Sequence, residues 1–247
     1  MTNQTDTDTG TSSSREEVKH LHDAGNHIKV DIWADIACPW CYLGKRRLDH
    51  AVATFIRNGS DDDRAVEIEF HSFELAPDLP VGKTQSMMEF QVNRQGLPAE
   101  EARDALDRMT RLGRRSGIEY NFDAMHVTNT ALAHQLVHYA KAAGRQLAAE
   151  EALFTAYFTD GRNLGDVEVL ADIADEIGLD RADAARSLAE NEHLAGFRAD
   201  NDLARSLGVN SVPFLIVDGT HALIGVKSPA TIENVLEQAW SERVRTR

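Results

Sequence analysis

The sequence is poor in cysteine, in basic residues and in long apolar runs, and each shortage excludes a class of protein. Two cysteines in 247 residues cannot form the disulfide framework of a small secreted domain. Asp and Glu number 40 against 26 Lys and Arg, which gives a formal net charge of −14. Nucleic acids and anionic membrane surfaces attract basic proteins, so we expect neither as a partner. No run approaches the ~18 apolar residues of a membrane helix, so no membrane contact is expected.

The first 27 residues differ in composition from the rest of the chain. They are rich in Thr, Ser, Asp and Asn, and they lack the apolar stretch of roughly 7–15 residues that a signal peptide needs. We therefore predict a disordered, solvating tail over residues 1–27 and a cytoplasmic protein. The remaining length suits one or two domains of ordinary globular composition.

Beyond the tail, short segments with alternating apolar and polar residues enclose a long block with helical spacing. Alternation predicts strands, and apolar residues three and four apart predict amphipathic helices. Asp-Gly between two apolar runs is the strongest hairpin signal in the sequence. The expected elements are strands 28–34 and 66–73 with a helix between them, several helices from 84 to 207, strands 213–217 and 221–225, and a last helix from 229.

This order is β-α-β, a helical block, and then β-β-α. The simplest arrangement joins the first and last segments in one small mixed sheet with helices, which makes the helical block an insertion. We therefore predict an α/β protein of β-α-β and β-β-α organisation with a large all-helical insertion. The expected domains are residues 28–80 plus 209–247, and residues 81–208.

The two cysteines, Cys38 and Cys41, lie where the first strand turns into a helix. A redox pair fits this position, because the unpaired N–H groups of the helix start stabilise a thiolate at Cys38. Cys41, one turn inside the helix, can then attack a mixed disulfide. Zinc would need two further ligands, which only histidines could supply. Two ordinary buried thiols are a third interpretation, and the spacing favours the redox pair without excluding the others.

Two prolines support the redox interpretation. Pro39 suits the first helical position and stiffens the turn between the two sulfur atoms. Far downstream, Val212-Pro213 precedes a strand, and a proline at the entrance of a strand often serves a special geometry, sometimes a cis peptide bond.

The segments 31–33 and 38–48, the latter reading CPWCYLGKRRL, resemble the active-site region of the DsbA-like thioredoxin family. The FrnE-like oxidoreductases are the branch that they resemble most. The resemblance extends over residues 28–240 and implies a thioredoxin fold interrupted by a helical domain. It also implies Cys38 as nucleophile, Cys41 as resolving thiol, and a cis Val212–Pro213 bond beside the sulfurs. Other segments that resemble the family are 73–78, 129–134, 153–161 and 208–214.

The predicted function is that of a thiol–disulfide oxidoreductase or isomerase acting on protein or small-molecule disulfides and thiols. The redox-active cysteine pair requires no cofactor and no metal, and glutathione is a candidate co-substrate. The oligomeric state is not predicted. The expected site residues are Cys38 and Cys41 as catalytic groups, with Pro39, Trp40, Val212 and Pro213 as substrate contacts.

Two alternative functions stay open. One is a glutathione-dependent isomerase or transferase on the same scaffold, although the related isomerases and transferases carry Ser at the first cysteine position. The other is a metal-binding or partner-binding module that uses the helical insertion.

Five charged residues near the cysteines have two interpretations each. Asp35 and Glu74 are candidate proton acceptors, although a capping or loop role is favoured. Lys45, Arg46 and Arg47 either attract anionic substrates or form the solvated face of their helix, which is the commoner role.

The helical block contains further candidates. His134 and His138 lie one helical turn apart but away from the apolar stripe of their helix, so we expect them in a cleft or on the surface rather than at a metal. Met87, Met88 and Phe90 either line a peptide groove or pack in the core, and core packing is favoured.

Overall fold

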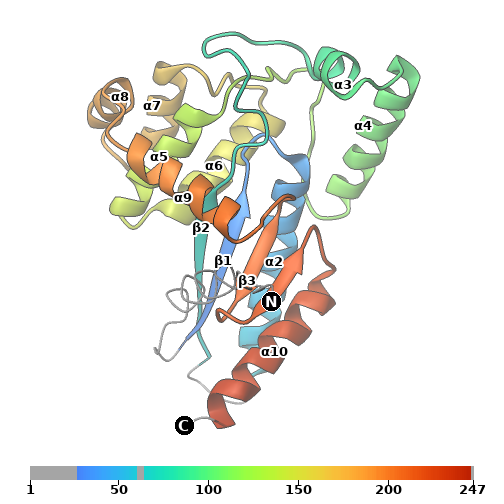
Figure 1. Cartoon of the computed structure of the whole chain (residues 1–247), viewed down its shortest axis with the longest axis vertical. Coiled ribbons are helices and arrows are strands. Elements are labelled where there is room, and N and C mark those ends of the chain that lie inside the picture. The colour runs from blue at the N-terminus through green and yellow to red at the C-terminus, as the bar shows by residue number, and fades with distance from the viewer. Residues whose placement is uncertain (1–26, 60–63, 246–247) are drawn as a thin grey trace, which may run out of the picture.

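The computed structural model describes residues 27–59 and 64–245 (Figure 1). The predicted tail, residues 1–27, lies outside the described residues except for His27. Among the described helices, none has the length and apolar character that crossing a bilayer requires. The elements are β1 Ile28–Ala34, α2 Pro39–Asn58, β2 Val66–Ser72, α3 Met87–Gln95, α4 Ala99–Arg114, α5 Ala131–Ala142, α6 Gln146–Phe158, α7 Val167–Glu176, α8 Arg181–Ala189, α9 Leu194–Ser206, β3 Phe214–Val217, β4 His221–Ile224 and α10 Pro229–Arg245.

The four described strands form one mixed sheet in the order β2-β1-β3-β4. Strand β1 pairs in parallel with β2 and antiparallel with β3, and β3 forms an antiparallel hairpin with β4. The hairpin turns at Asp218 and Gly219, which both have positive φ, at 53° and 68°, as the Asp-Gly signal predicts. The predicted fold class, a thioredoxin-like α/β sheet with a helical insertion, is confirmed.

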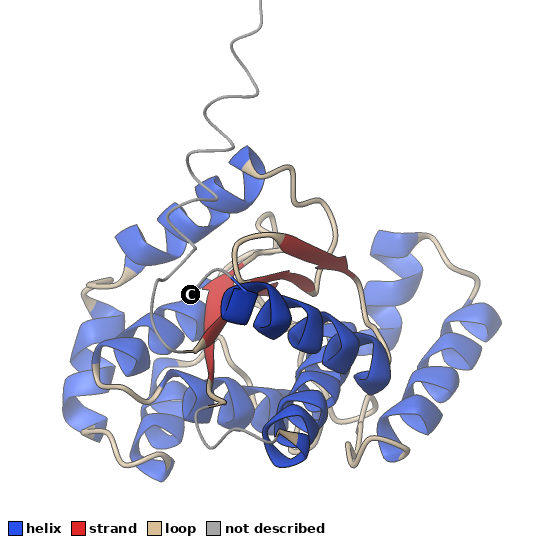
Figure 2. Ribbon diagram, turned by 90° about the horizontal axis from the view of Figure 1, so that it is seen from below, coloured by secondary structure: helices blue, strands red, loops and turns tan. Residues whose placement is uncertain are grey.

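The helices are divided between the two ends of the sheet. Helices α3 to α9, which lie between β2 and β3 in the chain, gather at the end of the sheet where β1 runs into α2, whereas α10 extends from the other end (Figure 1). Helices α2 and α10 pack against each other, and α10 also contacts β1 and β3. Seen from below, the strands lie in the middle of the surrounding helices (Figure 2).

Strand β1 is buried on both faces, although its alternating sequence is typical of a half-exposed strand. The apolar face contributes Val30 and Ile32 to the core, and the polar face carries Lys29 and Asp31. Helix α9 contacts β2 beside this polar face. The charges on this face of β1 are therefore enclosed and must find partners within the protein.

His71 of β2 supplies the central contact of this buried polar layer. Its Nε2 lies 2.8 Å from Asp31 Oδ1 on β1, and its Nδ1 lies 3.2 Å from Asp200 Oδ1 on α9. Its ring also stacks on Trp33, with ring centroids 4.6 Å apart. Burial lowers the pKa of His71, but the hydrogen bonds with Asp200 and Asp31 outweigh this and raise the pKa to about 9. A protonated imidazole therefore joins the central strand, an edge strand and the insertion.

We expect stability to depend on pH through His71. The folded pKa exceeds the unfolded value near 6.5, so the stabilisation is complete below that value and is lost as the pH rises through about 9. Between pH 6 and pH 10, the free energy of unfolding should fall about 3 kcal/mol further in the wild type than in His71→Gln. Urea unfolding at both pH values measures the difference. Equal falls in the two proteins would contradict the assignment.

Candidate functional site

The cysteine pair lies at the turn from β1 into α2. Cys38 is the N-cap residue of α2, with extended backbone angles, and Pro39 occupies the first helical position. The Cys38 N–H donates to the Asp35 carbonyl at 3.0 Å, and the Cys41 N–H donates to the Cys38 carbonyl at 2.9 Å. Cys41 is therefore within the first turn of the helix, directly beneath Cys38.

The two thiols differ in their access to solvent. Cys38 is 6% exposed and lines a cavity, whereas Cys41 is 0% exposed and does not reach that cavity. Burial raises the pKa of the Cys41 thiol well above its usual range, and a hydrogen bond with Cys38 adds to this rise. The sulfur atoms are thus adjacent, and only that of Cys38 is open to an incoming group.

Val212 and Pro213, which immediately precede β3, lie close to this turn. Their peptide bond is cis, and both residues are buried. The ring of Pro213 packs on α2 at Gly44, one turn after Cys41, where an added Cβ would lie 2.8 Å from Pro213 Cγ. The structure thus brings the six sequence-predicted site residues to one end of α2.

Trp40 and Pro39 form one wall of the cavity beside Cys38, whose volume is about 430 Å³. Trp40 is 46% exposed, so it presents an apolar surface to solvent at the cavity. Residues of helices α3 and α4 line the same cavity. Met87 belongs to the apolar core and Phe90 is partly buried against it, and both also line this cavity.

Asp35 connects the cysteine turn to two other parts of the chain. Its Oδ1 accepts hydrogen bonds from the Ala37 N–H at 3.0 Å and the Thr130 hydroxyl at 3.1 Å, and its Oδ2 accepts from the Leu75 N–H at 2.8 Å. Burial raises the pKa of Asp35, but His134, with Nε2 3.4 Å away, and the two N–H groups lower it below its usual range. A carboxylate held in this way accepts protons poorly, so its role is the loop role that the sequence favours.

His134 contradicts the expectation of a cleft or surface position. Its side chain is 1% exposed, contacts Asp35 and stacks on Phe197 of α9, with ring centroids 5.4 Å apart. The stripe on α5 indicates only one apolar face, whereas the structure covers this helix with α6, α9 and the Asp35 turn. His138 is also largely buried, and its Nε2 lies 3.1 Å from Asp200 Oδ2.

Two further carboxyl groups lie in this buried region. Burial raises the pKa of Glu74, whose Oε1 accepts a hydrogen bond from the Asn129 amide at 3.0 Å. Glu150 of α6 is fully buried, and burial raises its pKa to about 7. Its Oε2 has no hydrogen-bond partner among the described residues. No feature of the sequence distinguishes Glu150 from the surface acids of the same helix.

Tyr120 also contributes to the site and carries no sequence signal. It lies in the segment between α4 and α5, and its hydroxyl donates to the Pro39 carbonyl at 2.6 Å. Its ring packs edge-on against Tyr42 of α2, with centroids 6.1 Å apart. The insertion thereby holds the backbone between the two cysteines, through a residue about 80 positions away.

The basic residues after Cys41 are occupied by contacts within the protein. Lys45 is buried, which excludes the solvated face expected for it, and its Nζ lies 2.7 Å from Glu151 Oε2. Arg46 Nη2 lies 2.5 Å from Glu151 Oε1, and Arg47 donates to a backbone carbonyl just before α10. These contacts join α2 to α6 and α10.

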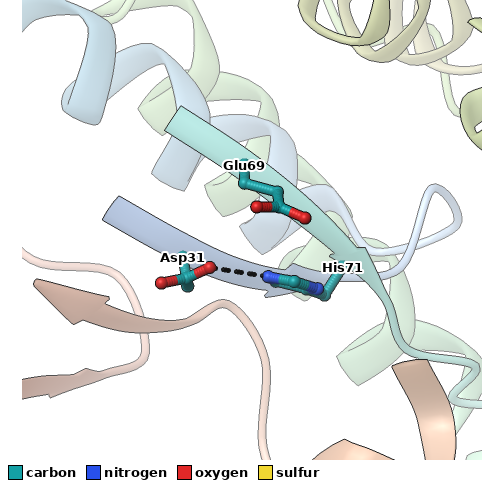
Figure 3. A group of neighbouring side chains, drawn as sticks. All are labelled: Asp31, Glu69 and His71. Atoms are coloured by element: carbon teal, nitrogen blue, oxygen red, sulfur yellow. Dashed lines mark hydrogen bonds and ion pairs between the residues drawn. The ribbon is translucent and has the colours of Figure 1, made fainter. Parts of the chain in front are cut away.

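A group of potential metal ligands lies elsewhere, on the sheet, and comprises Asp31, Glu69 and His71 (Figure 3). The dashed contact joins Asp31 to His71, and Glu69 lies beside them on β2. The Lys29 ammonium already lies 3.1 Å from Asp31 Oδ1 and 2.8 Å from Glu69 Oε2. The donor set therefore fits an ammonium and an imidazolium, and a metal ion would have to displace the lysine.

A model of the DSBA-like thioredoxin domain family matches residues 29–237. The crystal structure of a probable DsbA oxidoreductase from Streptomyces coelicolor is 32% identical, with a TM-score of 0.80, over 87% of this chain and 91% of that chain. The protein YwbO of Bacillus subtilis, which is uncharacterized, is 28% identical over 87% of this chain and 96% of its own.

A likeness at lower identity concerns the fold alone. The cytosolic disulfide reductase DsbM from Pseudomonas aeruginosa, solved with GSH, has a TM-score of 0.57 and 19% identity over 85% of this chain and 98% of that chain.

We expect Gly44→Ala to destabilise the protein. Replacing glycine by alanine inside a helix ordinarily stabilises by roughly 0.5–1 kcal/mol. Here the new methyl group would lie 2.8 Å from the Pro213 ring. Relieving this overlap should turn the ordinary gain in stability into a loss of about 1–3 kcal/mol in the free energy of unfolding. Urea unfolding of both proteins decides this, and a more stable variant would show that the contact is loose.

Removing the carboxyl group of Glu150 should stabilise the protein above neutral pH. The folded pKa of about 7 exceeds the unfolded value near 4.5, so the stabilising contribution of the protonated acid is complete below about pH 4.5 and lost as the pH rises through 7. As the pH rises from 4.5 to 8, the free energy of unfolding of Glu150→Gln should increase by about 1–3 kcal/mol relative to that of the wild type. Glu151→Gln, which removes the partner of Lys45 and Arg46, is the contrasting control and should lose stability at pH 8.

Proposed function

The chain belongs to the DSBA-like thioredoxin domain family, and from that premise we propose that it catalyses thiol–disulfide exchange through Cys38 and Cys41. The observation that carries the proposal is the unequal burial of two adjacent thiols at one helix start. Cys38 lines a cavity, and Cys41 lies fully enclosed beside it. An exchange enzyme requires this asymmetry, because one sulfur must meet the substrate and the other must wait for the mixed disulfide.

The reaction proceeds in two steps. The Cys38 thiolate attacks one sulfur of a substrate disulfide, which forms a mixed disulfide and releases the other substrate sulfur as a thiolate. Cys41 then loses its proton and attacks Cys38 Sγ, which forms the Cys38–Cys41 disulfide and releases the second substrate thiol. Two electrons pass from the protein to the substrate, and the reverse sequence oxidises a dithiol substrate.

The surroundings of the pair support each step. Cys38 is the N-cap residue of α2, where the positive end of the helix dipole would stabilise a thiolate. Burial raises the pKa of Cys41, which keeps this second sulfur protonated while Cys38 is free. Among the described residues, the Val212 backbone has no hydrogen-bond partner of its own, so it is free to pair with a bound peptide.

The direction of the exchange follows from the compartment. In a reducing cytoplasm, such a pair is held mostly as the dithiol. We therefore infer a reductase or isomerase of the FrnE-like branch, acting on protein or small-molecule disulfides, rather than an enzyme of bulk disulfide formation.

Replacing each cysteine separately tests the mechanism. Cys38→Ser should abolish reduction of a disulfide substrate, and Cys41→Ser should stop after the first step, so that intact mass spectrometry detects a mixed disulfide at Cys38. The sequence contains only these two cysteines, so the double variant is a cysteine-free control that should form no adduct. Full turnover in Cys38→Ser would reject the mechanism. Glutathione-dependent turnover in the double variant would favour the isomerase or transferase alternative.

A further inference from the structure

Part of the wall of the cavity beside Cys38 comes from two helices that the exchange chemistry does not otherwise use. Helices α3 and α4 pack against each other, and they line the cavity together with Pro39 and Trp40. The side chains that they place there are apolar or neutral with one exception. The apolar contributions of these helices are Met87, Phe90, Ala105, Leu106 and Met109.

Among the described residues that line the cavity, Asp35 and Arg94 carry a charge, and both are already paired. Asp35 accepts hydrogen bonds from two backbone N–H groups and one hydroxyl. Arg94, at the end of α3, donates to both carboxylate oxygens of Asp78, at 2.7 Å and 2.5 Å. The described residues that line the cavity therefore offer no unpaired cation to an anionic group, and moving an unpaired charge into an apolar cavity is costly.

The position of Cys38 determines what can occupy the cavity. Because Cys38 lines the cavity, a substrate sulfur bonded to Cys38 would bring its own substituent to the cavity. The volume of about 430 Å³ falls within the roughly 300–1,000 Å³ that is usual for small-ligand sites. The flexible side chains of Met87 and Met109 can adapt to substituents of different shape.

We propose that the α3–α4 hairpin forms a specificity pocket for an uncharged alkyl or aryl group attached to the substrate sulfur, and that it selects against anionic disulfides such as glutathione disulfide. This inference rests on the proposed exchange function and names its substrate class. The apolar group belongs either to a small thiol or to a side chain next to a cysteine in a peptide.

The bond changes are those of the first exchange step. As the Cys38 sulfur bonds to the substrate sulfur that carries the apolar group, the substrate S–S bond breaks and its other sulfur leaves as a thiolate. The apolar group is removed from water in the same step, so its burial favours the mixed disulfide. Cys41 then displaces the apolar thiol.

The test measures single-turnover oxidation of the reduced full chain by four disulfides. They are 4,4′-dithiodipyridine, glutathione disulfide, and the disulfide dimers of two blocked dipeptides, cysteinyl-phenylalanine and cysteinyl-aspartate. Each rate is divided by the rate of N-acetylcysteine with the same disulfide, which removes differences in intrinsic reactivity. We expect normalised rates about tenfold or more higher for the two apolar disulfides than for the two anionic ones.

Variants of the pocket connect this preference to the hairpin. Leu106→Gln should lower the normalised rates of the apolar disulfides about fivefold to tenfold and change those of the anionic disulfides less than twofold. Leu147→Gln, the same substitution at an exposed position on α6, is the matched control and should change neither. Phe90→Ala is a second pocket variant, and circular dichroism verifies that each variant is folded.

A gain of reactivity gives an independent readout. Asp78→Asn removes the partner of Arg94 and leaves this guanidinium free at the cavity, so the rate with glutathione disulfide should rise severalfold. The response to Leu106→Gln also identifies the source of the apolar group. If only the preference for 4,4′-dithiodipyridine responds, the source is a small thiol, and if only the preference for the apolar dipeptide disulfide responds, the source is a peptide.

Two outcomes would overturn the specificity pocket. They are a normalised preference for glutathione disulfide, and an equal effect of Leu106→Gln on all four disulfides. Failure of the exchange function itself is distinguishable, because oxidation would then persist in Cys38→Ser whatever the substrate.

Discussion

The buried carboxylate of Asp35 holds the cysteine turn in the position on which the rest of the site depends. It accepts hydrogen bonds from the turn itself, from the loop after β2 and from the start of α5, and it contacts His134 within that helix. One negative charge thus joins the sheet, the active turn and the insertion. Its burial is tolerable because each oxygen is satisfied, and this arrangement makes it a structural group rather than a proton acceptor.

A second set of buried charges performs the same task on the polar face of the sheet. Lys29, Asp31 and His71 are enclosed between the strands and the insertion, and Asp200 of α9 completes the set. The acidic chain thus buries its charges chiefly in pairs of opposite sign. Glu150 is an exception, because its Oε2 has no hydrogen-bond partner among the described residues and burial raises its pKa to about 7.

The two parts of the chain divide the proposed activity between them. The sheet and α2 place the two sulfur atoms in contact, with one enclosed and the other at a cavity. The insertion supplies part of the wall of that cavity and, through Tyr120, a hydrogen bond to the backbone between the sulfurs. Changes in α3 and α4 can therefore alter which substrates fit without disturbing the cysteine pair.

The local pattern of the sequence determined the order of the elements, the Asp218-Gly219 hairpin and the cysteine pair at a helix start, because these features depend on residues within a few positions of one another. Tertiary structure alone decided that His134 and Glu150 are buried, and that α3 and α4 line the same cavity as Trp40. Those properties arise from contacts between segments tens of residues apart, and such contacts leave no periodic trace in the sequence. A polar residue on a predicted helix is buried or exposed according to what packs over it, which only the folded chain determines.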